Sequence, residues 1–362
     1  MIRSGINIQT GASVSIEFDT HIRSITASEE RNVYLAPGFV DIQVNGFAGV
    51  DYNSAASPAE EIMRSADVIR ASGVTRYFPT VITGPVEAMV ASLKNLAAVR
   101  DRSIEGFHVE GPHLSPEEGP RGAHPLASIR PPDINEYRRW QEATDGRIRL
   151  VTVSPHWENA SPYIEALVRD GVTVSIGHTH ASAQQIADAV AGGASMSTHL
   201  GNAAHAQIRK QPNYIWDQLA DDRLTASFIC DGIHIGSAFL KCALRAKQLE
   251  RAVLVTDASS PAGATPGRYN LGEQAVDLTK DGRVVLAGTD RLAGSALKMI
   301  DAVRNVMRMA ELTLRDAIRL ATVNPARAVN MPGRQKGLVV GERADLVLLS
   351  LNLDVQETIV SN

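Results

Sequence analysis

The chain has 362 residues, enough for one large hydrophobic core with a smaller unit beside it. Hydrophobic residues make up 44% and charged residues 21%, which is typical of a folded globular protein and argues against a disordered chain. A net charge of -4, without any run of lysines and arginines, argues against a nucleic-acid-binding or membrane-surface protein.

The two ends of the chain carry strand-like patterns. Residues 1–35 alternate apolar and polar side chains with a period of two and show no helical pattern. Residues 337–360 again read as short strands separated by turn residues. We therefore expect residues 1–35 and 337–362 to pair into one small composite β-domain.

Between these ends, residues 36–336 alternate strand-like and helix-like segments. Eight short runs rich in β-branched residues predict strands, at residues 39–45, 74–80, 104–110, 148–154, 172–178, 195–200, 224–231 and 252–257. Amphipathic stretches such as residues 59–72 and 85–100 lie between them. Eight such units predict an α/β fold of the (β/α)8 TIM-type barrel class. An open doubly wound sheet is the alternative, but no Gly-x-Gly-x-x-Gly motif follows the first strand.

Residues 266–290 interrupt this alternation. They follow the eighth predicted strand and read as an inserted hairpin, with Asp281-Gly282 as its turn. Residues 312–329 return to a helical pattern that leads into the C-terminal strands.

Four residues with metal-binding or acid–base chemistry stand where predicted strands end. They are Glu110, His178, His199 and Asp257, at the third, fifth, sixth and eighth strands. Taken alone, each histidine is better explained by packing or hydrogen bonding than by metal binding, but a barrel would bring all four residues to one face. Three N/O ligands suit a catalytic zinc with an open position, and the remaining carboxylate suits proton transfer.

Longer motifs surround these residues and carry a resemblance to a known family. They are APGFVDIQVNGFAGVDYN (36–53), HVEGPHL (108–114), RGAHP (121–125), GHTHAS (177–182), THLGNAAH (198–205), DGIHI (231–235), VTDASSPAG (255–263), LAGSALKM (292–299) and GERADLVLLS (341–350). Over nearly its full length the chain resembles the N-acetylglucosamine-6-phosphate deacetylases of the amidohydrolase superfamily. The resemblance implies a metal-bearing barrel with a composite β-domain, in agreement with the patterns above.

The resemblance also implies roles for the residues at the strand ends. It assigns Glu110, His178 and His199 as ligands of Zn2+ or another divalent metal, and Asp257 as the general acid/base. Gln43 falls beside the metal, where many amidohydrolases have the first histidine of a His-x-His pair, and Asn45 falls at the second. An amide is a far poorer metal ligand than imidazole, which favours one metal per chain.

The substrate side departs more from the family pattern. The resemblance implies that His124 contacts the sugar, and that Asn202, the backbone of Ala203 and His234 lie near a phosphate. The family also uses an arginine from a neighbouring subunit, which makes a homodimer the expected partner. Here Lys210 falls at that position and Arg209 precedes it. A solvated basic loop explains this pair equally well.

The resemblance therefore predicts zinc-dependent hydrolysis of the N-acetyl group of N-acetylglucosamine 6-phosphate. The same chemistry on another N-acyl substrate is an alternative, such as N-acetylgalactosamine 6-phosphate or an unphosphorylated N-acetyl amino sugar. A non-catalytic barrel that binds sugar phosphates is the alternative from another class. Nucleic acid and membranes are not expected partners.

The cysteine content bears on the compartment. Cys230 and Cys242 are too few for a disulfide framework, and they do not form a Cys-x-x-Cys pair. We expect two reduced, buried thiols in a cytoplasmic protein.

Overall fold

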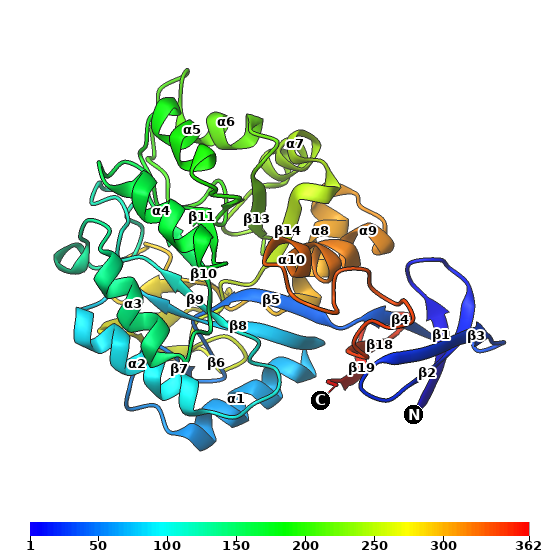
Figure 1. The fold of residues 1–362 in the computed structure, drawn as a ribbon. Coiled ribbons are helices and arrows are strands. Elements are labelled where there is room, and N and C mark those ends of the chain that lie inside the picture. The colour runs from blue at the N-terminus through cyan, green and yellow to red at the C-terminus, as the bar shows by residue number, and fades with distance from the viewer. Residues whose placement is uncertain (362) are drawn as a thin grey trace.

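The computed structural model describes residues 1–361, and its centre is a barrel of eight parallel strands (Figure 1). In barrel order these strands are β5 (Phe39–Val44), β8 (Val74–Ile82), β9 (Phe107–Glu110), β10 (Ile148–Val153), β11 (Thr173–Ile176), β12 (Met196–Ser197), β13 (Thr225–Ile229) and β14 (Ala252–Val255). A parallel bridge between Val44 and Ala258 joins the first strand to the end of the eighth. This closure confirms the predicted barrel and contradicts the open doubly wound sheet.

The barrel strands form because their sequences suit burial on both faces. Every residue of β5 and β8 is buried, as expected for parallel strands that face the barrel interior on one side and helices on the other. Eight helices follow the strands in turn: α1 (Ala59–Ala71), α2 (Val86–Ala98), α3 (Ile134–Ala143), α4 (Ala160–Arg169), α5 (Ala183–Ala191), α6 (Tyr214–Ala220), α7 (Ser237–Lys247) and α8 (Met299–Ala310). The other helical elements of the described chain are η1 (Leu126–Ser128), η2 (Leu249–Arg251), α9 (Leu314–Leu320) and α10 (Val323–Ala328).

A second sheet joins both ends of the chain at one side of the barrel (Figure 1). Its strands, in spatial order, are β19 (Val355–Ile359), β18 (Leu346–Ser350), β4 (Val33–Pro37), β1 (Ile2–Asn7), β2 (Ser13–Phe18) and β3 (Ile22–Ala27). It has its own small core, which includes Ile16, Phe18 and Leu346. The composite sheet of the predicted fold class is therefore present. The division of the chain into two domains stays a prediction, since only Gly38 separates β4 from β5.

The insert after the eighth strand is larger than the single hairpin expected from the sequence. It holds three antiparallel strands, β15 (Gly267–Leu271), β16 (Gln274–Leu278) and β17 (Val284–Leu286). Asp281-Gly282 does lie in the second turn. The first turn contains Gly272, whose φ of 59° is left-handed, and it lacks an Asn-Gly or Asp-Gly pair that would have revealed it. A separate short ribbon pairs β6 (Gly46–Phe47) with β7 (Val50–Asp51).

Within residues 1–361, no helix combines the length and apolar character needed to cross a membrane.

Cys230 is buried as expected, but Cys242 is exposed, so the expectation of two buried thiols was wrong for that residue. Cys242 lies on the solvent-facing side of α7, which is an amphipathic helix. Which side of such a helix faces solvent depends on how the helix packs against the barrel.

Candidate active site

The four residues at the predicted strand ends meet in one cavity at the carboxyl end of the barrel. Glu110 ends β9, while His178, His199 and Asp257 each lie two residues beyond the end of their strand. All four are buried, and all four line a cavity of about 130 Å³. The other residues that line it are Asn45, Ile82, Gly122, Ala123, His124, Asn202, Ala203, Ile229, His234, Leu271, Leu292 and Gly294.

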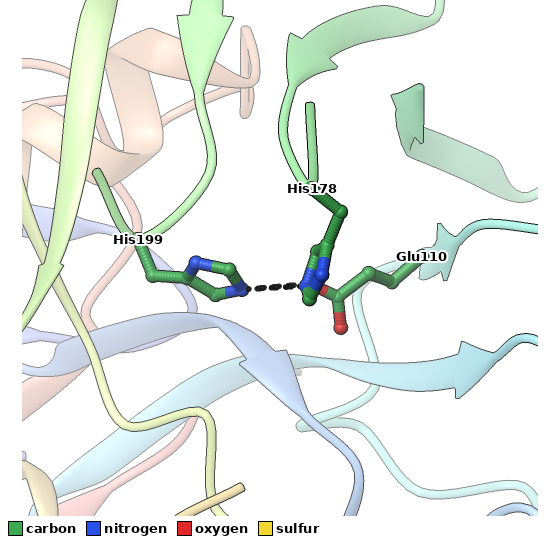
Figure 2. A group of neighbouring side chains, drawn as sticks. All are labelled: Glu110, His178 and His199. Carbon is green, nitrogen blue, oxygen red and sulfur yellow. Dashed lines mark hydrogen bonds and ion pairs between the residues drawn. The ribbon is translucent and has the colours of Figure 1, made fainter. Parts of the chain in front are cut away.

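Glu110, His178 and His199 turn their ligand atoms toward one point (Figure 2). Glu110 Oε1 lies 2.9 Å from His199 Nε2 and 3.2 Å from His178 Nε2. The two Nε2 atoms are 3.2 Å apart. Ligands of a tetrahedral zinc, bound at about 2.0–2.1 Å, are spaced by roughly 3.4 Å, so this triangle fits one such ion.

The surroundings of the triangle also suit a metal. His178 Nδ1 lies 2.9 Å from the carbonyl oxygen of Pro120, which accepts its hydrogen and leaves the Nε2 lone pair facing the triangle. Burial opposes ionisation of Glu110, but its close contacts with the imidazoles of His178 and His199 hold its pKa well below the ordinary value. Glu110 is therefore ready to bind as a carboxylate. Its assignment as a ligand, like those of His178 and His199, stays a prediction.

Asp257 lies beside the triangle and is held by two amides. Its Oδ1 accepts hydrogen bonds from Asn45 Nδ2 at 2.7 Å and from Gln43 Nε2 at 3.1 Å. Gln43 Nε2 also donates to Glu110 Oε1 at 3.0 Å, so it links the acid/base candidate to the triangle. Burial, reinforced by the negative charge of Glu110, raises the pKa of Asp257 to about 6, close to the range that suits proton transfer near neutral pH.

Three of these residues have strained backbones. The φ angles of His178, His199 and Asp257 are 48°, 28° and 50°, in the left-handed region that non-glycine residues seldom adopt. Such strain persists only where the surrounding structure imposes it, and it clusters at functional sites. Here it turns the chain at each strand end so that the side chain faces the cavity.

His124 covers the triangle from the loop after β9. Its ring lies 4.3 Å from the ring of His178, centroid to centroid, at an angle of 78°. Its Nδ1 is 2.8 Å from the hydroxyl oxygen of Thr83, the residue directly after β8. Burial, helped by the nearby His178, holds the pKa of His124 well below the ordinary value.

The residues predicted near a phosphate line the same cavity. Asn202, Ala203 and His234 follow β12 and β13, and His234 Nδ1 lies 2.6 Å from Asp231 Oδ2, which orients the ring. Arg209 and Lys210 do not line this cavity within one chain. Arg209 borders a separate groove near Tyr214, and Lys210 is exposed.

Some residues of the site did not stand out in the sequence. Asn45 was identified only by its place in a His-x-His position, and its hydrogen bond to Asp257 had no sequence signal. Thr83 carried none either, because a threonine after a strand is common. The apolar wall of Ile82, Leu271 and Leu292 was missed because its members come from three distant segments.

Comparisons with known proteins agree with this geometry. The model of the amidohydrolase family matches residues 34–362. The N-acetylglucosamine-6-phosphate deacetylase of Bacillus subtilis (strain 168) is 31% identical over 363 residues, covering 98% of this chain and 90% of that protein. The N-acetylgalactosamine-6-phosphate deacetylase of Escherichia coli O157:H7 is 32% identical over 340 residues, covering 92% and 88%.

A solved structure is also similar. It is a mutant N-acetyl-D-glucosamine-6-phosphate deacetylase from Mycobacterium smegmatis in complex with N-acetyl-D-glucosamine-6-phosphate. It is 32% identical, with a TM-score of 0.92, and the match covers 100% of this chain and 98% of that chain.

A parallel barrel whose strand ends bring together two imidazoles and two carboxylates fits a metal-dependent hydrolase. This enzyme class contradicts the alternative of a non-catalytic barrel. The chain belongs to the amidohydrolase family, as its motifs predicted.

Proposed function

We propose that the chain hydrolyses the N-acetyl group of N-acetylglucosamine 6-phosphate to give glucosamine 6-phosphate and acetate. The observation that carries this proposal is the meeting of Glu110, His178, His199 and Asp257 in one cavity. The names of the Bacillus subtilis relative and of the Mycobacterium smegmatis complex support the choice of sugar. We place the activity in the cytoplasm, as expected from the sequence.

The cofactor we propose is one zinc ion per chain, held by Glu110, His178 and His199. One carboxylate and two imidazoles match the N/O ligand set of catalytic zinc sites. Gln43 supports a single ion, because its amide nitrogen, which is a hydrogen-bond donor and not a metal ligand, faces both Glu110 and Asp257.

In the proposed reaction, the metal ion and the side chains of the site have separate roles. A bound divalent ion supplies Lewis acidity, which lowers the pKa of water and polarises the acyl carbonyl. Asp257 takes the proton of the attacking water as the new C–O bond forms. Because Oδ1 already accepts two amide hydrogens, Oδ2 is the oxygen left for this transfer. Asp257 returns the proton to the amine nitrogen as the C–N bond breaks, and His124 donates a hydrogen bond to the carbonyl oxygen.

The phosphate would lie on the other side of the cavity. Asn202, the backbone N–H of Ala203 and His234 offer donors there. Arg209 and Lys210 would reach it only from a second copy of the chain, so we propose a homodimer in which this basic pair completes the neighbouring site. Lysine would supply a point charge, without the two-pronged contact of arginine.

A second substrate has its own support. The relative from Escherichia coli O157:H7, named an N-acetylgalactosamine-6-phosphate deacetylase, is as similar to this chain as the Bacillus subtilis relative. N-acetylgalactosamine 6-phosphate is therefore the second candidate. An unphosphorylated N-acetyl amino sugar is the third, since Lys210 stands where the family pattern has the arginine that reaches the phosphate.

The test is acetate release by the purified, zinc-loaded protein from both N-acetyl hexosamines, each with and without the 6-phosphate. We expect the highest kcat/KM on N-acetylglucosamine 6-phosphate and about one zinc per chain by elemental analysis. Absence of acetate release from all four sugars would refute the proposed activity. Equal turnover with and without the phosphate would refute the phosphate requirement, and two tightly bound ions per chain would refute the single-metal site.

A further inference from the structure

Thr83 follows β8 directly and contacts His124 at the edge of the site. Its hydroxyl oxygen lies 2.8 Å from His124 Nδ1, and both side chains are buried. Within the described residues 1–361, this is the only hydrogen bond of the Thr83 side chain. The hydroxyl therefore has no other structural partner among the groups that surround it.

The backbone around Thr83 leaves room for this hydroxyl. A Cβ atom placed on Gly111 would lie 2.2 Å from the Thr83 hydroxyl oxygen, closer than atoms can approach. Gly111 also has a left-handed φ of 90°. The glycine after the ligand candidate Glu110 thus allows Thr83 and His124 to meet.

The hydrogen bond determines which ring nitrogen of His124 carries the proton. A buried hydroxyl hydrogen needs an acceptor, and Nδ1 of His124 is the one within reach. If the hydroxyl donates to Nδ1, that nitrogen has no hydrogen, and a neutral imidazole then carries its proton on Nε2. The Nε2–H of His124, a residue that lines the cavity, is then available as a donor.

We infer that Thr83 is a positioning residue that sets the Nε2–H tautomer of His124, so that this imidazole donates to the acyl carbonyl oxygen of the substrate. The inference rests on the proposed function, because the carbonyl oxygen is that of an N-acyl sugar. A donor is worth most when it strengthens as the oxygen gains negative charge in the transition state. Thr83 therefore acts on kcat more than on KM.

The tautomer is measured directly by 15N NMR on zinc-loaded protein labelled at histidine, with the His124 signals assigned by their loss in His124→Gln. We expect the Nε2–H tautomer in the wild type. A wild-type ring protonated on Nδ1 overturns the inference, whatever the activity. Because the NMR measurement needs no turnover, it tests the tautomer of His124 even if the wild type releases no acetate. A failure of this inference can therefore be told apart from a failure of the proposed function.

Two variants test the consequence for catalysis. Thr83→Val keeps the shape of threonine and removes the hydroxyl, whereas Thr83→Ser keeps the hydroxyl. We expect Thr83→Val to lower kcat by about 10- to 100-fold, less than the ~10²–10³ that follows loss of an oxyanion donor itself, with little change in KM and in zinc content. Thr83→Ser should retain most of the activity. Unchanged kcat in Thr83→Val, or an equal loss in both variants, overturns the inference.

Discussion

At the scale of the residue, the site depends on how one carboxylate is held. The side chain of Asn45 makes one hydrogen bond within the described part of the chain, and its acceptor is Asp257 Oδ1. We predict that Asn45→Leu lowers kcat by about 10- to 150-fold, because a hydrogen bond to a charged group contributes about 1.5–3 kcal/mol and 1.4 kcal/mol corresponds to a factor of ten. Steady-state kinetics and zinc analysis check this, with KM and zinc content expected to change little.

Asn324 offers the matched control. It is also a buried asparagine, but its Nδ2 donates to the backbone carbonyls of Leu249 and Ala252. These carbonyls lie at the amino end of β14, which is the end of the barrel opposite the cavity. Asn324→Leu should lower the melting temperature and leave kcat close to that of the wild type. If both variants lose kcat in proportion to their loss of stability, Asn45 has only a structural role.

At the scale of the element, the three-stranded insert forms one wall of the cavity. Leu271 ends β15 and packs with Ile82, which ends β8, in a small hydrophobic cluster. Gln274 Nε2 donates to the carbonyl of Ala123 at 2.7 Å, which ties the insert to the loop that carries His124. β12, which leads to Asn202, is the sixth strand and lies opposite β8, the second. If the phosphate lies toward β12, as we propose, the methyl of the N-acyl group is expected against the apolar wall of Ile82, Leu271 and Leu292.

This arrangement predicts a limit on acyl size. We expect Leu271→Ala to reduce the preference for N-acetyl over N-propionyl sugar phosphate by about 10-fold, since a methylene in a tight apolar pocket is worth about 1–3 kcal/mol. The measurement is kcat/KM for both substrates. Leu286→Ala is the control, because Leu286 packs on the same cluster but does not line the cavity. A similar change in preference in Leu286→Ala, or none in Leu271→Ala, would contradict this role of the insert.

At the scale of the whole molecule, a buried ion pair joins the barrel to the terminal sheet. Arg76 of β8 donates to Asp345, the residue before β18, with an Nε–Oδ2 distance of 2.8 Å and side chains 3% and 0% exposed. Burial alone would raise the pKa of Asp345, but the charge of Arg334 and the hydrogen bonds from Arg76 outweigh it and hold that pKa at about 2.

The sign of the resulting pH dependence follows from this lowered pKa. The carboxyl is more acidic in the folded chain than its ordinary value of 3.8, so its contribution is complete above about pH 4 and is lost as the pH falls toward 2. We predict that Asp345→Asn lowers the free energy of unfolding at pH 7 by roughly 3–5 kcal/mol, because two buried guanidinium groups lose this counter-charge. Arg334 loses the carboxylate that lies 3.5 Å from its Nε, and Arg76 keeps the longer ion pair with Glu105, at 3.4 Å, in its place. Urea denaturation between pH 3 and pH 7 should show the difference from the wild type narrowing at the acidic end.

Asp19 is the control for this ion pair. It pairs with Arg23 at the surface, where the two side chains are 57% and 59% exposed, so Asp19→Asn should leave the unfolding midpoint nearly unchanged. A loss of stability in Asp345→Asn that was the same at pH 3 and pH 7 would mean that the carboxylate charge is not its source.

The sequence by itself determined the barrel, the composite sheet and the set of metal and acid/base candidates. Each depends on a local signal: runs of β-branched residues mark the strands, and Glu110, His178, His199 and Asp257 stand where those runs end. Only the tertiary structure decided that Asn45 and Gln43 meet Asp257, that Thr83 meets His124, and that Leu271 reaches Ile82. These pairs lie on different strands and loops, and their contacts depend on barrel closure, strand register and the path of the insert, which no local pattern encodes.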